Sequence, residues 1–383
     1  MRLELTAAQQ SFRDELRDFY SRTVLKDWRE KYPDFESLGA YLREWEYTLD
    51  AEGWAVPQWP TEWGGRAADS VERAIFTELS AEFDAPEGIN RLGKRLVAPV
   101  LMRSGTAAQQ QHIARIKNSE EVWCQGFSEP GAGSDLLSLR TSARLDGDEW
   151  VVNGRKIWTS FAQFSEWIML LVRTGAPDSG AAGISILLVE LNTPGIEISP
   201  IQTISGRSEF NEVSFEDVRV PKENLVGEVD GGWAIVREVL QDERGAEFNL
   251  ARFSDIRRVF EDQVDVERDL PAESRHAATI GADYARIYTI QLFAMDLLRR
   301  GQDGTAPAAL ESLLKLYTTE TWRGFGDHQL LAFGPEIYER GGFESLVDYY
   351  ESRHYTISAG TSEIQRNTIA GRLLGLPSSR RKS

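Results

Sequence analysis

The chain has 383 residues, of which 41% are hydrophobic, and it carries a formal net charge of −17. Such a length suits two or three domains, and such acidity argues against a nucleic-acid-binding surface or an anionic membrane surface. The single cysteine, Cys124, excludes an internal disulfide and fits a reducing compartment. No apolar run approaches the ~18 residues of a membrane span, and the first residues lack the apolar segment of a signal peptide. We therefore expect a cytoplasmic protein.

The first part of the chain, from residue 6 to about residue 118, shows the apolar spacing of amphipathic helices. Thr6 is a candidate N-cap because Gln9 stands three residues later, in the capping-box position. Prolines and glycines within residues 57–65 break the helical pattern and predict a loop. Further helices are expected over residues 35–52, 70–83 and 107–117.

From about residue 119 the pattern changes to short runs rich in Val, Ile, Leu and aromatic residues, which predict strands. The expected strands cover residues 122–127, 138–145, 149–152, 167–173, 184–190 and 212–215. Asp146-Gly147 is a good hairpin turn between two of them. Several short strands at this spacing favour a barrel or a sandwich. The chain has no G-x-G-x-x-G sequence, so a Rossmann domain is not expected.

After Gly231-Gly232 the helical spacing returns. Long helices are expected over residues 272–301 and 306–332, and a last helix from Thr361 to just before Gly375. Helices, then strands, then helices predict an α+β protein of three parts. We place a helical domain at residues 1–118, a strand-rich domain at 119–230 and a second helical domain at 231–383.

Two runs in the strand-rich part carry the chemistry. The first is WCQGFSEPGAGSD at residues 123–135, and the second is NGRKIWTS at residues 153–160. Pro130 and the glycines beside it form a turn whose hydroxyls and backbone N–H groups suit a polar ligand edge. Trp158 adds an aromatic plane. Together they suit a flat, polar-edged ring such as a flavin, and the alternative is an ordinary turn beside a core tryptophan.

These runs closely resemble the flavin-binding segment of the acyl-CoA dehydrogenase family. Four other blocks resemble the same family in the same order: WPTEWGG at residues 59–65, SGTAAQ at 104–109, NEVSFEDVRVP at 211–221 and GTSEIQR at 360–366. The resemblance implies an N-terminal helical domain, a central β-barrel and a C-terminal four-helix bundle.

The resemblance also implies an activity and its partners. The expected enzyme is an FAD-dependent acyl-CoA dehydrogenase of lipid catabolism, of the β-oxidation type, which forms a trans-2-enoyl-CoA by removing the α proton and transferring the β hydride to flavin N5. An electron-transfer flavoprotein would accept the electrons. The expected assembly is a homo- or hetero-oligomer, a dimer of dimers. No metal, nucleic acid or membrane partner is expected.

The family's cofactor contacts can be carried over position by position. The residues expected at the FAD are Phe127, Ser128, Gly133, Ser134, Trp158, Thr159, Ser160, Thr361 and Glu363. Ser134 should also lie near the pantetheine arm of the substrate, and Arg244 is a further candidate substrate contact. Trp123 and Trp150 are expected to be core residues.

The position of the catalytic base departs from the commonest family pattern. Many members carry Glu directly before the Gly-Thr pair, where this chain has Ala359, whose backbone N–H can still polarise the thioester oxygen. A minority, including isovaleryl- and long-chain acyl-CoA dehydrogenases, carry the Glu on an earlier helix in a Leu-x-x-Glu-Arg context. Residues 240–244 read LQDER, so Glu243 is the expected base. Asp242 and Glu247 are the nearby competitors.

The FAD pyrophosphate contacts depart as well. Residues 260–268, FEDQVDVER, lack the family's Arg-Lys-x-Phe-Gly-Lys segment, and residues 328–334, HQLLAFG, replace a Gly-Gly pair. Arg252, Arg257 or Arg258 could substitute, or a partner subunit could supply the donors. Two other functions therefore stay open: an acyl-CoA oxidase or flavin hydroxylase on this scaffold, and an FAD-poor or non-catalytic subunit of a hetero-oligomer. No short motif encodes the acyl chain, whether branched, long or steroid-type.

Overall fold

The computed structural model describes residues 5–32, 34–242, 246–272, 275–302, 307–333 and 342–377. The chain forms two compact units, each assembled from separated segments. The helical unit comprises Met1–Lys26, Ala68–Ala85 and Glu243–Ser383, and the sheet unit comprises Asp27–Ala67 and Pro86–Asp242. The domain boundaries expected from the sequence follow chain order and remain a prediction.

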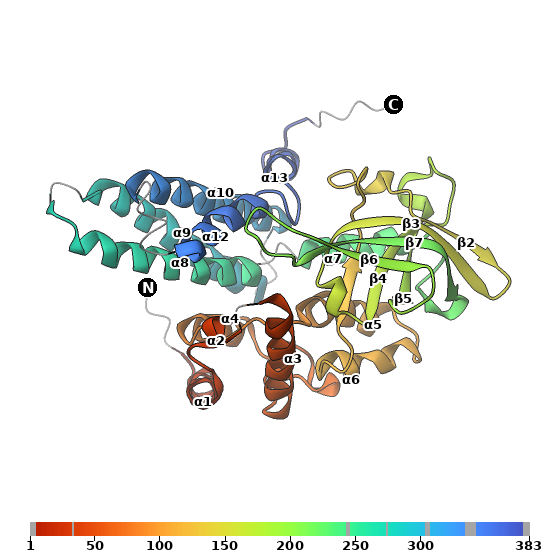
Figure 1. Ribbon diagram of the computed structural model, residues 1–383, viewed down its shortest axis with the longest axis horizontal. Helices are drawn as coiled ribbons and strands as arrows, with labels where there is room; N and C mark the ends of the chain where they lie inside the picture. The colour runs from red at the N-terminus through yellow and green to blue at the C-terminus, as the bar shows by residue number, and fades with distance from the viewer. Residues whose placement is uncertain are drawn as a thin grey trace. The chain divides into compact units, whose positions relative to one another are not determined.

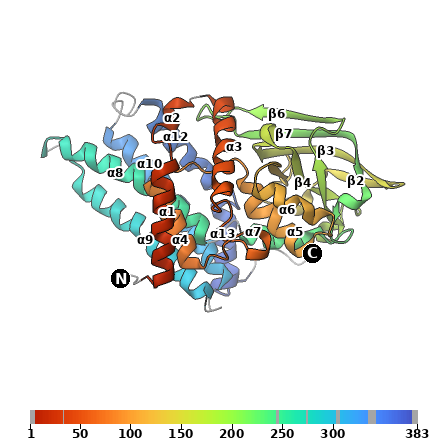
Figure 2. The same ribbon diagram turned by 90° about the horizontal axis from the view of Figure 1, so that it is seen from below.

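The helical unit is built from long helices that pack on one another. Figure 1 shows α8, α9 and α10 lying side by side, and Figure 2 shows α1 beside α4. The helices are α1 (Ala7–Thr23), α4 (Ser70–Glu82), α8 (Ala246–Asp269), α9 (Ala277–Gln302), α10 (Ala308–Phe333), α12 (Gly342–Tyr355) and α13 (Ser362–Thr368). The core between them contains Phe253, Ile287 and Phe325. Within the described ranges, no helix combines the length and the hydrophobicity needed to cross a bilayer.

Helix α1 begins where its capping signal predicts. The Gln9 backbone N–H donates to Thr6 Oγ1 at 3.2 Å, and the Thr6 N–H donates to Gln9 Oε1 at 3.1 Å, so the capping box is complete. The buried face of α1 packs on α4 through Tyr20, whose ring lies 6.2 Å from that of Phe76. The first helix of the chain therefore belongs to the unit that holds the last ones.

The sheet unit contains eight strands in the order β6-β7-β3-β2-β4-β5-β8, with β1 paired to β4. The strands are β1 (Trp123–Gly126), β2 (Ser142–Asp146), β3 (Glu149–Ser160), β4 (Trp167–Arg173), β5 (Ile184–Glu190), β6 (Ile196–Ile201), β7 (Phe210–Pro221) and β8 (Leu225–Val226). The helices of this unit are α2 (Trp28–Lys31), α3 (Phe35–Ala51), α5 (Ala98–Ser104), α6 (His112–Lys117) and α7 (Gly232–Asp242).

Strand β4 is apolar at every position from Ile168 to Val172 because both of its faces are buried. On β4, Ile168 and Leu170 join one core with Val213 of β7. Met169 joins a second core with Leu101 of α5. Trp123 and Trp150 are buried, as expected. Alternate residues of one strand therefore fill two cores, which accounts for the run without polar residues.

The structure corrects several expected boundaries. The strand expected from residue 138 starts only at Ser142, because the Glu129 carboxylate accepts the backbone N–H groups of Arg140 and Thr141 at 2.7 and 2.8 Å. Those two N–H groups are thereby diverted from the strand ladder. The strand expected to end at Val152 continues to Ser160. Strands β6 and β8 and helices α8 and α12 were not predicted from the sequence pattern.

Strand β3 continues past Val152 because Gly154 adopts a backbone that side chains disfavour. Its φ is +150°, at a register shift against β7, and an added Cβ would lie 2.6 Å from the Cα of Thr141. We expect Gly154→Ala to lower the free energy of unfolding by about 1–3 kcal/mol. Urea denaturation measures the change. Gly131→Ala is the control, because nothing lies within 4 Å of its Cβ position, and a change as large as that of Gly154→Ala would contradict the explanation.

Candidate active site

A β-bulge in β3 exposes Trp158. The pairing with β7 shifts between Lys156 and Thr159, and Trp158 lies within this shift at a φ of +61°. A bulky residue at positive φ is an outlier. Lys156 and Trp158 are two residues apart and would share a face of a regular strand, yet Lys156 is fully buried and Trp158 is 55% exposed. The bulge therefore turns one flat aromatic ring outward.

The two hydroxyls after Trp158 are placed differently. The Thr159 side chain is buried in the sheet unit, and its backbone carbonyl accepts a hydrogen bond from Asn211 Nδ2 at 3.0 Å. Ser160 is half-buried at the end of the strand. Ser160 is therefore accessible close to Trp158. The Thr159 hydroxyl is buried and has no hydrogen-bond partner among the described residues, and its expected contact with FAD remains a prediction.

The first run ends beside the second. The Ile157 backbone N–H donates to the carbonyl of Ser128 at 2.9 Å, so the loop after β1 is bonded to β3 next to Trp158. Phe127 is buried, Ser128 is half-buried, and Gly133 and Ser134 are exposed. The structure thus brings the loop that carries Ser128 beside the part of β3 that carries Trp158.

A buried ion pair joins this loop to β3. Lys156 Nζ donates to Glu129 Oε1 at 2.8 Å and to the carbonyl of Phe127 at 3.1 Å. Neither charged side chain was predicted to be functional. The sequence does hold a signal for this pair: the acidic Glu129 lies in the first run, and the basic Lys156 lies within the strand pattern of the second run. The pair ties the loop that carries Ser128 to the strand that carries Trp158.

Burial and mutual attraction shift both groups of the pair. Burial lowers the pKa of Lys156 to about 8, although the attraction of Glu129 opposes that shift. Burial alone would raise the pKa of Glu129, but the charge of Lys156 and the hydrogen bonds from Lys156 and the two backbone N–H groups outweigh it. The pKa of Glu129 is therefore below its ordinary value, as expected for a buried carboxylate that accepts three hydrogen bonds.

In the helical unit, Ala359 lies in a left-handed turn between α12 and α13. Its φ is +52°, and that of Gly360 is +89°. Gln365, which is fully buried, donates from Nε2 to the carbonyls of Ala359 and Gly360, at 3.0 Å each. No described residue accepts a hydrogen bond from the Ala359 backbone N–H. A strained turn with its carbonyls held and this N–H unpaired is consistent with a donor for a ligand.

Thr361 and Glu363 stand at the start of α13. Thr361 is the N-cap, and its hydroxyl accepts the Ile364 backbone N–H at 3.2 Å. Glu363 is exposed, and backbone N–H donation together with the Thr361 hydroxyl lowers the pKa of its carboxyl. Both residues are accessible on the helical unit, and their expected place near the adenosine half of FAD remains a prediction.

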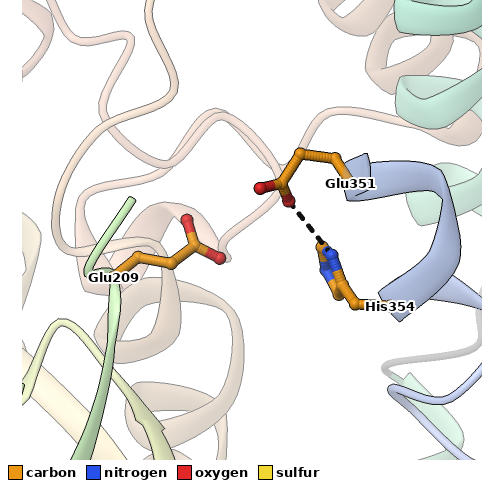
Figure 3. A group of neighbouring side chains, drawn as sticks. All are labelled: Glu209, Glu351 and His354. Carbon is orange, nitrogen blue, oxygen red and sulfur yellow. Dashed lines mark ion pairs between the residues drawn. The ribbon is translucent and has the colours of Figure 1, made fainter. Parts of the chain in front are cut away.

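The end of α12 is held by aromatic and charged contacts. Tyr355 stacks on Trp322 with ring centroids 4.7 Å apart, and the Arg252 guanidinium lies 4.2 Å from the centroid of the Tyr355 ring. Figure 3 shows the adjacent ion pair, Glu351 Oε2 to His354 Nδ1 at 3.0 Å. Glu209, also drawn in Figure 3, belongs to the sheet unit.

The expected base lies outside the described residues. Glu243 and Arg244 fall between α7 and α8, in the interval 243–245. The competing side chains, Asp242 and Glu247, are likewise outside the described side chains. The assignment of the base therefore continues to rest on the sequence.

The residues of the sheet unit fit a flavin. Trp158 offers an exposed indole, and Gly131 and Gly133 would leave open space even with a Cβ. Among the described residues, none hydrogen-bonds to the hydroxyls of Ser128 or Ser160. An aromatic plane beside unpaired hydroxyls and open glycine backbone suits a flat ring with hydrogen-bonding edges.

Comparison with known families agrees with this site. The acyl-CoA dehydrogenase N-terminal domain matches residues 6–115, the acyl-CoA dehydrogenase middle domain matches 124–218, and the acyl-CoA dehydrogenase C-terminal domain matches 230–374. The chain belongs to the acyl-CoA dehydrogenase family. Membership confirms the expected α+β fold and the expected enzyme class, an oxidoreductase acting on acyl-CoA.

Individual relatives match over nearly the whole chain. Acyl-CoA dehydrogenase IpdE1 of Mycobacterium tuberculosis is 38% identical over 347 residues, 88% of each chain. The solved structure of the Tcur3481-Tcur3483 steroid ACAD has a TM-score of 0.87 at 28% identity, covering 99% of this chain and 100% of that one. The ChsE4-ChsE5 complex from Mycobacterium tuberculosis has a TM-score of 0.84 at 28% identity, with the same coverage.

Proposed function

We propose that this chain is an FAD-dependent acyl-CoA dehydrogenase that converts an acyl-CoA thioester into its trans-2-enoyl-CoA. The observation that carries the proposal is Trp158. An indole 55% exposed at a φ of +61° is held there by a β-bulge, beside a loop with unpaired hydroxyls. A bound ring covering the indole would account for both the strain and the exposure.

The chain's residues divide the reaction between them. Trp158, Ser160 and Ser128 would hold the flavin ring, and bound FAD would accept the β hydrogen as hydride. The Ala359 N–H would donate to the thioester oxygen, which makes the α C–H more acidic by stabilising the developing enolate. Glu243 would then take the α proton.

Two further contacts are proposed at the ends of the ligands. Ser134 and Arg244 would contact the CoA substrate. Thr361 and Glu363 would lie near the adenosine half of FAD. None of these contacts involves the α carbon, so loss of one should weaken binding more than it slows proton removal.

The FAD pyrophosphate is proposed to be held by a second subunit. Arg257 and Arg258 each face an acid one turn further along α8, Glu261 at 3.6 Å and Asp262 at 4.0 Å, and Arg252 lies over the Tyr355 ring. These guanidinium groups are already engaged within the helical unit. The related ChsE4-ChsE5 structure is a complex. We therefore favour a hetero-oligomer, a dimer of dimers, with an electron-transfer flavoprotein as the electron acceptor.

The proposed substrate class is a bulky acyl-CoA, of the steroid side-chain type. The support is the similarity to the Tcur3481-Tcur3483 steroid ACAD, together with the expected base on the earlier helix. A panel of butyryl-, isovaleryl-, palmitoyl- and steroid side-chain acyl-CoAs with an artificial electron acceptor discriminates these classes. Turnover restricted to short straight chains would contradict this part of the proposal.

The flavin site is tested by the colour of the purified protein. We expect yellow protein with FAD in the sheet unit's site, either when the chain is purified alone or when it is coexpressed with a partner chain encoded beside it.

Trp158→Ala should weaken FAD binding by about 1–3 kcal/mol, the usual value of ring stacking, as measured by titration of the apoprotein with FAD. The control is Tyr47→Ala, because Tyr47 is an exposed aromatic residue of α3. Colourless protein under both conditions would support a subunit without FAD.

A further inference from the structure

A buried lysine holds the turn that carries Ala359. Lys315 on α10 is 1% exposed, and its Nζ donates to the carbonyls of Tyr355 and Gly360, at 2.9 Å each. Tyr355 is the last residue of α12, where carbonyls lack partners within the helix. The two accepting carbonyls bracket the turn, so one ammonium group fixes both of its ends.

A second buried donor acts on the same turn. The Gln365 amide reaches the carbonyls of Ala359 and Gly360, and the Gly360 carbonyl therefore accepts from both side chains. An added Cβ at Gly360 would lie 2.7 Å from Gln365 Nε2, so the turn is closely packed there. The Ala359 N–H lies in the peptide plane that joins Ser358 to Ala359, because each peptide unit is rigid. That plane stands between the held carbonyl of Tyr355 on one side and the held carbonyls of Ala359 and Gly360 on the other, so its orientation is restrained from both ends.

The donor is a lysine, which brings a positive charge to this turn when it is protonated. Burying a positive charge is costly, and a neutral donor would satisfy two carbonyls with a smaller desolvation penalty. A positive charge behind the Gly360 peptide would also favour negative charge developing on the other side of the turn. That is the charge an enolate oxygen acquires.

We propose that Lys315, together with Gln365, is a positioning residue that holds the Ala359 N–H in place as donor to the thioester oxygen. This inference rests on the proposed dehydrogenase function. Neither side chain has to touch the substrate. Each acts on the backbone that does, so its loss should slow the reaction without weakening acyl-CoA binding to the same extent.

The test compares Lys315→Met with Asp283→Asn in the FAD-loaded protein, coexpressed with its partner chain where loading requires one. Asp283 is a buried charged residue of the same helical unit whose partners are His328 and Arg286, so its variant controls for general destabilisation. We expect anaerobic flavin reduction to slow about 10²-fold in Lys315→Met, with the apparent affinity for acyl-CoA within about threefold, a modest change for a binding constant. Asp283→Asn should reduce flavin at close to the wild-type rate.

A spectroscopic measurement separates positioning from a merely structural role. Infrared spectra of bound enoyl-CoA with carbon-13 at its thioester carbonyl report polarisation of that carbonyl. We expect a stretch shifted to lower frequency in the wild type and in Asp283→Asn, and a smaller shift in Lys315→Met. If Lys315→Met does not fold, Gln365→Met carries the test, with the same slower reduction and smaller shift.

Wild-type rate and carbonyl shift in the folded variants would overturn the inference while leaving the proposed function intact. Equal slowing in Asp283→Asn would overturn it as well, because the effect would then be general. A wild-type protein that reduces no flavin with any acyl-CoA of the panel would overturn the proposed function, and this inference with it.

Discussion

Glu243→Gln should slow reduction of bound flavin by acyl-CoA about 10²–10⁴-fold, the range typical for loss of a general base. Glutamine keeps the shape of the side chain but cannot accept the α proton. The motivation is that Ala359 leaves the family's commoner base position without a carboxylate, while Glu243 occupies the alternative position. Stopped-flow measurement of flavin absorbance under anaerobic conditions gives the rate.

The control for this variant is a carboxylate returned to the other position. Ala359→Glu in the Glu243→Gln background should partly restore reduction, and both variants should bind FAD and enoyl-CoA. Glu247→Gln, which changes the nearby competing acid, should reduce flavin at close to the wild-type rate. Rapid reduction in Glu243→Gln would reject the assignment and transfer it to Glu247, Asp242 or a partner subunit.

Lys156→Met should lower the free energy of unfolding by about 3–5 kcal/mol, because it leaves the buried Glu129 carboxylate without its counter-charge. The wild-type pair is enclosed, with exposed side-chain fractions of 0% and 8%. The variant also removes the bond to the Phe127 carbonyl, so FAD should be released more readily. Urea denaturation followed by circular dichroism measures the stability.

Arg219→Met is the matched control on the same sheet. Arg219 pairs with Asp146 and Glu149 at 3.2 Å each, but all three side chains are about half exposed. Such pairs contribute about 0–1 kcal/mol. Equal losses in Lys156→Met and Arg219→Met would show that burial of the Lys156–Glu129 pair has no special consequence.

The same pair gives a pH dependence with a defined sign. The pKa of Lys156 is lowered to about 8 from 10.5, so between these values the unfolded chain binds more protons at this site than the folded chain. This contribution to stability is therefore fully present above 10.5 and is lost as the pH falls through about 8. The difference in unfolding free energy between the wild type and Lys156→Met should move in the wild type's favour as the pH is raised from about 8 to 10.5.

Local signals predicted much of the fold. The capping residues placed the start of α1, and apolar runs placed β4 and β5 at their observed bounds, because each depends on nearby residues. The assembly of α1 and α4 with the C-terminal helices depends on contacts between distant segments, which spacing does not encode. The late start of β2 has a similar origin, since a side chain 11 and 12 residues away accepts the backbone N–H groups.

The site was predictable in composition but not in geometry. The sequence identified Trp158 and the loop hydroxyls, yet a simple period of two would have placed Lys156 and Trp158 on one face. The bulge that separates them requires a left-handed tryptophan, which no propensity predicts. Lys315 and Gln365 escaped notice for another reason: a lysine and a glutamine on helices are ordinarily exposed, and only the packing shows that these are buried.

One measurement tests the central claim most directly: anaerobic titration of the FAD-loaded protein with the acyl-CoA panel. Flavin absorbance and enoyl-CoA formation are followed in the same samples. The proposed function predicts bleaching of the flavin by at least one acyl-CoA, with one enoyl-CoA formed for each flavin reduced. A loaded, folded protein whose flavin stays oxidised with every acyl-CoA of the panel, in the presence of its partner chain, would contradict it.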